Sequence, residues 1–358
     1  MPHTVPVPNS ATAIVFTAPG CIELRHAQLQ PLAARQYRVR TLYSMTSPGT
    51  ELRVLAGHYG AAGKFPLVPG YSSVGRIEEL GADVVGYRVG DLVSCRNPAV
   101  PLVGLSMMWG GQASQHVCAS IGEDRPVLLP DGADPLDFVT AEISAISLRG
   151  VTAAAPRPGE TAVVVGQGLI GASSAMWLSA AGCRVIVCDT EAGRLKRARA
   201  WSSQSVRIGD GDHVARLNTL LEGGADIVVE ASGTTPGFAL ARTLLRRKPQ
   251  AYGIDYKVEP IQFYHQDWPR LVLQANYLDE VPVNPFNMVA GEGMILLAPK
   301  DRGVEDRQAA IESLRRRLVP AASLVQRVLP AAQAPAAYLG LRDDRAANFS
   351  LVLDWAGV

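Results

Sequence analysis

TAVVVGQGLIG, residues 161–171, is an apolar run rich in β-branched side chains that ends in the spacing G-x-G-x-x-G. A parallel strand buried on both faces is nearly all Val, Ile and Ala, so the run predicts a central strand. Gly166 permits a tight turn, Gly168 lets a pyrophosphate approach the backbone, and Gly171 lets the following helix pack closely on the strand. The segment therefore predicts a dinucleotide-binding turn.

The residues around this turn support the same interpretation, against the alternative of a merely structural turn. A helix-compatible stretch, ASSAMWLSAAG, follows it, and a second apolar run, CRVIVCD, ends in Asp189. The amides at the helix N-terminus would hold the phosphates. A carboxylate at Asp189 would accept hydrogen bonds from the adenosine ribose hydroxyls and repel a 2′-phosphate, which favours NAD(H) over NADP(H). Arg194, five residues later, could instead contact a 2′-phosphate. The expected cofactor contacts are Gly166, Gln167, Gly168, Leu169, Ile170, Gly171, Asp189, Arg194 and Ser232.

Composition excludes several classes of protein. A net charge of +1 over 358 residues argues against a nucleic-acid partner. The N-terminal residues MPHTVPVPNS lack the features of a signal peptide, and no segment approaches 18 uninterrupted apolar residues. We therefore expect a soluble, cytoplasmic protein without a membrane partner. The five cysteines are widely spaced and contain no C-x-x-C pair, which predicts neither a disulfide framework nor a cysteine zinc cluster.

The chain changes character after Pro130, and its length favours two domains. Residues 11–120 contain short β-like runs between Gly and Pro, which predict an irregular antiparallel β domain. The following segments alternate between strand and helix patterns, namely TAVVVG, RVIVCD, EAGRLKRARAW, DIVVEASG, FALARTLLRR and QAYGID, and GMILLAP could add a last strand. This alternation predicts an α/β fold with a doubly wound parallel sheet. The tail, with SLVQRVLP, PAAYLGL and FSLVLDW, is expected to dock on the first domain.

Three segments resemble the medium-chain dehydrogenase/reductase superfamily. They are the Gly-rich segment Phe65–Val93, WGGQASQHV at Trp109–Val117, and VLPAAQAPAAYLGL in the tail. The resemblance implies a β-rich GroES-like catalytic domain over residues 1–145, a Rossmann NAD-binding domain over 146–298, and a return to the catalytic domain over 299–358. It also implies a homodimer joined through edge strands of the nucleotide domains, a role that MILLAP could serve.

The metal ligands of the zinc-dependent relatives are mostly replaced. The resemblance places Pro48 where they have a ligand cysteine and Tyr71 where they have a histidine, and leaves Glu142 as the one surviving ligand. One carboxylate cannot make a zinc site that needs three protein ligands. The lobe with four cysteines is also missing, because no other cysteine lies between Cys95 and Cys118. We therefore expect no zinc. The chain looks most like a zinc-less branch that includes bacteriochlorophyllide a dehydrogenase, which implies oxidation of a secondary alcohol to a ketone with NAD.

Without zinc, other groups must stabilise the developing alkoxide. Tyr71 could donate a proton, or its ring could simply fill the space of the metal. Thr50 could hydrogen-bond the substrate oxygen, or it could stabilise the turn after Pro48 and Gly49. Glu142 could act as a general acid or base, or it could pair with an arginine such as Arg53 or Arg149.

Substrate contacts are expected from His58, Glu51 and Trp109 in a cleft between the two domains, with Met108 as a further wall residue. Each of the first three has an ordinary alternative. His58 could be a surface histidine, Glu51 could anchor a loop, and Trp109 could belong to the domain core. His265 has suitable chemistry but is poorly placed in the sequence.

The sequence thus predicts a zinc-independent, NAD(H)-dependent oxidoreductase of biosynthesis or sugar metabolism. It would interconvert a secondary alcohol and a ketone on a small or specialised-metabolite substrate. Three alternatives remain open: an NAD(P)H-dependent reductase of an activated C=C bond, a redox-neutral epimerase or lyase that retains NAD, and a nucleotide-binding protein without catalysis.

Overall fold

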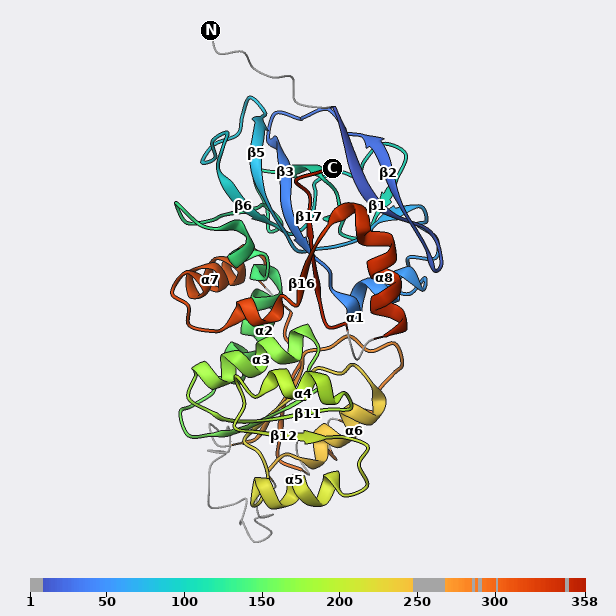
Figure 1. The fold of residues 1–358 in the computed structure, drawn as a ribbon. Coiled ribbons are helices and arrows are strands. Elements are labelled where there is room, and N and C mark those ends of the chain that lie inside the picture. Colours follow the sequence, from blue (N-terminus) through green and yellow to red (C-terminus); the bar gives the residue numbers. More distant parts are fainter. Residues whose placement is uncertain (1–8, 247–267, 285–286, 289–291, 301, 345–347) are drawn as a thin grey trace. The chain divides into compact units, whose positions relative to one another are not determined.

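The computed structural model describes residues 9–246, 268–284, 287–288, 292–300, 302–344 and 348–358 (Figure 1). The chain divides into two compact units, which we call the first and second unit. The first contains Met1–Ala145 and Arg302–Val358, and the second contains Ile146–Asp301.

The second unit contains a sheet of six parallel strands. Their order is β12 (Gln204–Arg207), β11 (Arg184–Asp189), β10 (Thr161–Val165), β13 (Ile227–Glu230), β14 (Arg270–Leu273) and β15 (Ile295–Leu297). Two series of strands thus run outward in opposite directions from β10, which is the doubly wound arrangement. The fold class predicted from the sequence is confirmed. The predicted strand QAYGID, residues 250–255, lies outside the described residues.

Four helices cover this sheet. Figure 1 shows α3 (Leu169–Ala180) and α4 (Ala192–Ala198) on one side, and α5 (His213–Leu221) and α6 (Thr235–Thr243) on the other. The central strand β10 is buried on both faces, which explains its unbroken apolar sequence. Val163 and Val165 pack with Ile186 of β11 and Val228 of β13 in one core cluster.

The first unit contains two sheets. The smaller has the order β2 (Cys21–Gln28), β1 (Ser10–Ala18), β4 (Leu67–Val68) and β7 (Ser106–Met107). The larger has the order β16 (Arg327–Pro330), β17 (Leu351–Asp354), β3 (Gln36–Met45), β5 (Ser73–Leu80), β6 (Leu92–Cys95) and β9 (Val127–Leu128), with β8 (Gln115–Ala119) also paired to β3. Because β17 pairs with β3, the tail of the chain completes a sheet that the N-terminal half begins.

The helices of the first unit come from both ends of the chain. They are α1 (Pro48–Leu55), α2 (Ala141–Ala154), which continues into the second unit, α7 (Val304–Arg315) and α8 (Ala334–Asp343). Helix α8 packs against α1 and β2, and Tyr338 meets Phe16 edge to face at a centroid distance of 5.5 Å. The expected docking of the tail on the first part of the chain is thus present.

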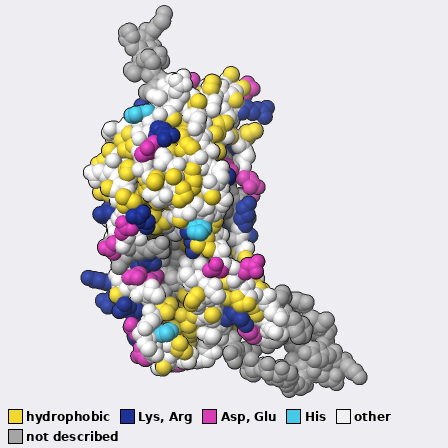
Figure 2. All heavy atoms as spheres, turned by 90° about the vertical axis from the view of Figure 1, so that its right-hand side faces the viewer, with side chains coloured by type: hydrophobic (Ala, Val, Ile, Leu, Met, Phe, Trp, Pro, Cys, Tyr) yellow, Lys and Arg dark blue, Asp and Glu magenta, His cyan; other side chains and the backbone are white. Residues whose placement is uncertain are grey.

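The surface carries charged side chains of both signs. On the face shown in Figure 2, basic and acidic side chains are interspersed and do not gather into a patch of one sign. A broad basic face, which a nucleic-acid partner would need, is therefore absent from the described part of that view. None of the described helices is both long enough and apolar enough to cross a membrane.

Candidate active site and cofactor cradle

The glycine-rich turn has the geometry that its sequence predicts. Gly166 has a φ of 91°, and a Cβ there would lie 2.8 Å from the backbone nitrogen of Ser232. A Cβ on Gly171 would lie 1.8 Å from the carbonyl oxygen of Gly166, so α3 can approach β10 only without one. Gly168 is the N-cap of α3, and a Cβ there would meet no atom within 4 Å. The turn thus leaves open space at the N-terminus of a helix, where an anionic group is favoured.

Asp189 lies at the end of β11 and is 4% exposed. Its carboxylate accepts hydrogen bonds from the backbone N–H of Gln167 at 2.6 Å and of Glu191 at 2.8 Å. These bonds tie the end of β11 to the glycine-rich turn on β10. They fix the carboxylate where a ribose would lie when phosphates occupy the N-terminus of α3.

Two arginines lie close to this carboxylate. Nη1 of Arg194 is 3.6 Å from Oδ2 of Asp189. The pKa of Arg197 is lowered by burial and by Arg194, and Asp189 opposes this effect. The region that would receive the ribose therefore contains positive as well as negative charge.

Ser232 follows β13 and lies against the turn. Its backbone N–H donates to Glu230 at 2.8 Å, and its hydroxyl also donates to this carboxylate. Glu230 is fully buried and accepts a further hydrogen bond from the Tyr277 hydroxyl. Sequence reasoning identified Ser232 but missed Glu230, although an acid that ends the apolar run DIVVE is a visible signal.

The other predicted cofactor residues belong to the same loop. Gln167 is 1% exposed, and its side chain donates to the Gly166 carbonyl at 3.1 Å. Leu169 and Ile170 form the first turn of α3. The open N-terminus of α3, the close approach at Gly171 and the fixed Asp189 fit a dinucleotide, so the residues present suit NAD(H) or NADP(H).

In the first unit, the hydroxyl groups of Tyr71, Ser47 and Thr50 lie together. The Tyr71 hydroxyl lies 2.7 Å from Oγ of Ser47, and it also hydrogen-bonds the Thr50 side chain. Ser47 is the N-cap residue of α1, and Thr50 belongs to its first turn, so the helix start positions both hydroxyls. Tyr71 is 7% exposed, and the Trp109 ring meets it edge to face at 5.5 Å.

Burial determines the protonation state of this phenol. It raises the pKa of Tyr71 to about 12, partly opposed by the hydrogen bonds from Ser47 and Thr50. Glu51 and Glu142 raise this pKa further through their charges. The phenol therefore keeps its proton at neutral pH and is available as a donor.

Glu51 is fully buried beneath the same helix start. Its carboxylate accepts the backbone N–H of Ser47 at 2.7 Å, the Gln112 amide at 3.3 Å and the Tyr338 hydroxyl. Burial raises the pKa of Glu51 to about 7, against the effect of these three hydrogen bonds. This geometry matches the loop-anchoring alternative for Glu51 better than substrate contact.

Glu142, in the first turn of α2, forms ion pairs with two arginines. Its Oε1 lies 3.0 Å from Nε of Arg96, and its Oε2 lies 3.7 Å from Nε of Arg307. The expected pairing with an arginine is present, and Arg96 and Arg307 supply it where the sequence suggested an arginine such as Arg53 or Arg149. Arg307 is far away in sequence, and only the return of the tail brings it to α2.

The remaining predicted residues are less informative. His58 is exposed in the turn after α1. Trp109 is half-buried and contacts Tyr71, while Met108 belongs to a core cluster of the first unit. His265 lies outside the described residues.

The expectation of no cysteine zinc cluster finds no support at Cys95, His116 and Cys118, which could hold a metal ion. Both cysteines are buried, and their sulfur atoms and a ring nitrogen of His116 all lie within 4.8 Å of one another. The sequence spacing does not indicate this group, because Cys95 belongs to β6 and His116 and Cys118 belong to β8. Wide spacing in sequence does not prevent contact between strands of one unit.

Known proteins are similar to this chain in sequence and in fold. Residues 35–127 match the alcohol dehydrogenase GroES-like domain family. A sorbitol dehydrogenase of Halalkalibacterium halodurans is 28% identical over 255 residues, which cover 64% of this chain and 71% of that protein. An alcohol dehydrogenase of Cupriavidus necator is 27% identical over 271 residues, which cover 65% of this chain and 73% of that protein.

Solved structures share the fold. A short chain alcohol dehydrogenase from E. coli CFT073, complexed with NADH, aligns with a TM-score of 0.80 at 16% identity and covers 97% of this chain and 100% of its own. A dehydrogenase from Sinorhizobium meliloti 1021, bound to NADP, aligns with a TM-score of 0.77 at 16% identity, again over 97% and 100% of the two chains. In the domain match, the fold and the curated relatives, this chain is similar to oxidoreductases of the zinc-type alcohol dehydrogenase-like, medium-chain dehydrogenase/reductase superfamily.

Proposed function

We propose that this protein interconverts a secondary alcohol and a ketone with NAD(H), and that it does so without zinc at the position of the metal in its zinc-dependent relatives. The observation that carries the proposal is the Tyr71 hydroxyl, which Ser47 and Thr50 hold at a position where the resemblance expects a histidine ligand.

The second unit supplies the cofactor half of the reaction. Bound at the glycine-rich turn, the nicotinamide would accept or give the hydride. The chain's own contribution is to hold the phosphates at the N-terminus of α3 and the ribose at Asp189.

The first unit supplies the proton. When a ketone is reduced, its oxygen gains negative charge and needs a proton as the carbon gains hydride. Burial keeps Tyr71 protonated for this donation, and the Ser47 and Thr50 hydroxyls can stabilise the phenolate that remains.

The residues at the position of the metal in zinc-dependent relatives offer too few ligands for a metal ion here. Pro48 has no side-chain donor atom, and the carboxylate of Glu142 is engaged by Arg96 and Arg307. These two guanidinium groups compensate the charge of Glu142, as a cation would in a metal-dependent relative. The proposed chemistry therefore relies on hydroxyl donors and not on a Lewis acid.

The relatives suggest the substrate class. Since one similar protein is named a sorbitol dehydrogenase and another an alcohol dehydrogenase, we propose a polyol or another secondary alcohol as substrate. A cytoplasmic homodimer is part of the same proposal, with the edge strand β15 of the parallel sheet as the pairing strand.

A second candidate function is the reduction of an activated C=C bond with NADPH. Arg194 beside Asp189 favours it, because a guanidinium there could bind a 2′-phosphate. Separate calorimetric titrations with NADH and NADPH distinguish the two candidates. Tighter binding of NADPH would favour the second.

The catalytic role of Tyr71 is tested by Tyr71→Phe, with Tyr43→Phe in β3 as a matched control. Loss of a positioned general acid lowers kcat by about 10²-fold or more. We expect this loss on a panel of polyols and ketones for Tyr71→Phe and an unchanged kcat for the control. An unchanged kcat for Tyr71→Phe would refute the proposal.

A further inference from the structure

Two cysteines and a histidine lie together inside the first unit, apart from the hydroxyl groups around Tyr71. His116 and Cys118 are two residues apart in β8, so the alternation of a strand puts their side chains on one face. Cys95 ends β6. Strand β8 pairs with β3 and β6 pairs with β5 and β9, so no strand pairing accounts for the meeting of the three side chains.

The backbone between the two strands explains how the three side chains meet. The N–H of Ala99, in the loop after β6, donates to the Val117 carbonyl in β8 at 2.7 Å. This bond folds the loop back along β8 and brings Cys95 toward Cys118. The thiol of Cys118 and the ring of His116 both hydrogen-bond to Cys95.

The three donor atoms are close enough to share one ion. In a tetrahedral zinc site, sulfur and nitrogen ligands lie roughly 3.5–3.8 Å apart. The corresponding atoms of Cys95, His116 and Cys118 all lie within 4.8 Å of one another, so small side-chain movements suffice.

The surroundings lack other partners for the imidazole. His116 is 3% exposed, and its Nδ1 is buried without a hydrogen-bond partner among the described residues. A buried polar atom without a partner costs free energy, so the buried imidazole has an unmet need for a partner.

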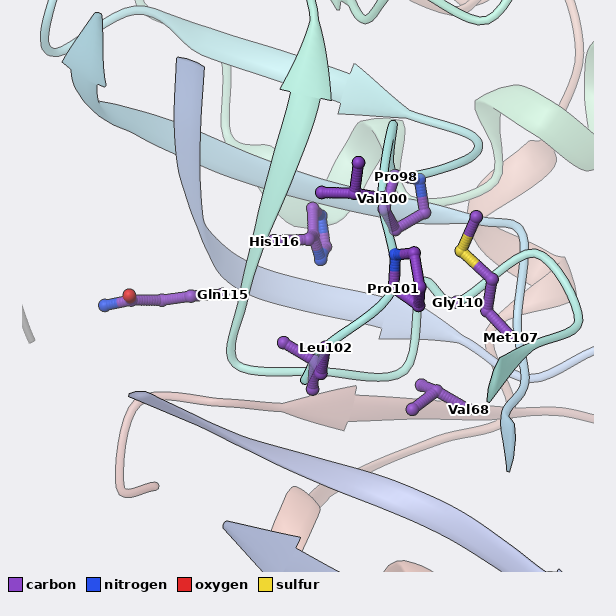
Figure 3. A pocket seen from close by; sticks show the side chains of 10 residues that line it. Val68, Pro98, Val100, Pro101, Leu102, Met107, Gly110, Gln115 and His116 are labelled. Carbon is purple, nitrogen blue, oxygen red and sulfur yellow. The ribbon is translucent and has the colours of Figure 1, made fainter. Parts of the chain in front are cut away.

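A small pocket borders the cluster on the side of the imidazole. Figure 3 shows His116 at its wall, and the other lining residues are mostly apolar: Val68, Pro98, Val100, Pro101, Leu102, Met107, Gly110, Ala113 and Gln115.

We propose that Cys95, His116 and Cys118 bind one thiophilic divalent cation of the zinc class. The ion ties β6 to β8, two strands that are not neighbours in the sheet. Two thiolates neutralise its charge, and a fourth coordination position remains for a small non-protein ligand. The site shares no residue with Pro48, Tyr71 and Glu142, where the resemblance places the metal of zinc-dependent relatives, so it does not depend on the proposed function.

The test uses the full-length protein, metal analysis and cobalt spectroscopy. We expect about one zinc ion per chain after purification with zinc in the medium. Replacement by Co²⁺ should give thiolate-to-cobalt charge-transfer absorption in the near ultraviolet and the visible bands of a tetrahedral ion. This readout needs no variant, so it holds even where a substitution prevents folding.

Variants assign the ligands. Cys118→Ser should lose the metal and the charge-transfer absorption, while Cys183→Ser in the second unit should keep both. Glu142→Gln should also keep the metal, because the proposed site does not use that carboxylate. The proposal is overturned if the protein takes up neither ion, if mass spectrometry shows a Cys95–Cys118 disulfide in metal-free protein, or if Glu142→Gln loses the metal and Cys118→Ser keeps it.

Discussion

Glu142 has two interpretations, and one substitution separates them. Its side chain is 1% exposed and that of Arg307 is 0% exposed. Glu142→Gln preserves the size of the side chain and removes its charge, which leaves the Arg307 guanidinium buried without its carboxylate. Removing one partner of a buried ion pair costs about 3–5 kcal/mol. Arg307 keeps hydrogen bonds to the carbonyls of Glu123 and Arg125, which favours a loss near the lower limit, about 3 kcal/mol.

Denaturant unfolding measures this loss, and an exposed ion pair of the same unit supplies the control. Glu23 pairs with Arg25 at 2.6 Å, and their side chains are 47% and 39% exposed. Glu23→Gln should therefore change the free energy of unfolding by about 1 kcal/mol or less. The double variant Glu142→Gln/Arg307→Met should be more stable than the sum of its two single losses predicts, because it leaves no unpaired buried charge.

The refuting result is specific. Suppose that Glu142→Gln is as stable as wild type while kcat falls by about 10²-fold and one limb of its pH profile disappears. The carboxylate would then be a general acid or base and not a partner that holds α2 and α7 together. A loss of stability with an unchanged pH profile of kcat would support the structural interpretation.

Three further predictions concern other residues. Asp189→Ser should weaken NADH binding at least about tenfold and strengthen NADPH binding, measured by titration calorimetry, because it removes the ribose acceptor and its charge; an unchanged preference would contradict the assigned role. Glu51→Gln should alter the pH dependence of stability. Burial raises the pKa of Glu51 from 4.5 to about 7, so its protonated form stabilises the fold below about pH 4.5. Relative to the variant in denaturant unfolding, this contribution to the free energy of unfolding declines by about 3 kcal/mol as the pH rises to 7. A constant difference in stability between the two proteins across that range would refute it. Gly171→Ala should lower the free energy of unfolding by about 1–3 kcal/mol, because its Cβ would lie 1.8 Å from the Gly166 carbonyl oxygen. The control Gly168→Ala should leave the free energy of unfolding unchanged, because its Cβ would meet no atom within 4 Å. Equal stability of the two variants would show that α3 can shift.

Local patterns predicted the second unit well. Four of its described parallel strands, β10, β11, β13 and β15, match apolar runs identified in the sequence, and the glycine-rich turn has a positive φ at Gly166 and the expected close contact at Gly171. These features depend on neighbouring residues: alternation of strand and helix, β-branched runs, and glycine where a Cβ would collide. Such constraints act within a few residues and so remain visible in the sequence.

The candidate site of the first unit was only partly predictable. The resemblance pointed to Tyr71, Thr50 and Glu142 by position, and the structure brings Tyr71 and Thr50 into contact. Ser47 was not identified as a partner of Tyr71, because a serine before Pro-Gly is an ordinary helix N-cap. The arginine partners of Glu142 were missed, because any of many arginines could satisfy one carboxylate.

The sequence alone determined the class of fold and the dinucleotide turn with its acid, since each is a property of adjacent residues. Only the tertiary structure decided which distant groups share a buried space: Arg307 with Glu142, Tyr338 with Glu51, and Cys95 with His116 and Cys118. The reason is physical. A buried charge, hydroxyl or thiol must find a partner, but its identity depends on how strands and helices from distant parts of the chain pack together.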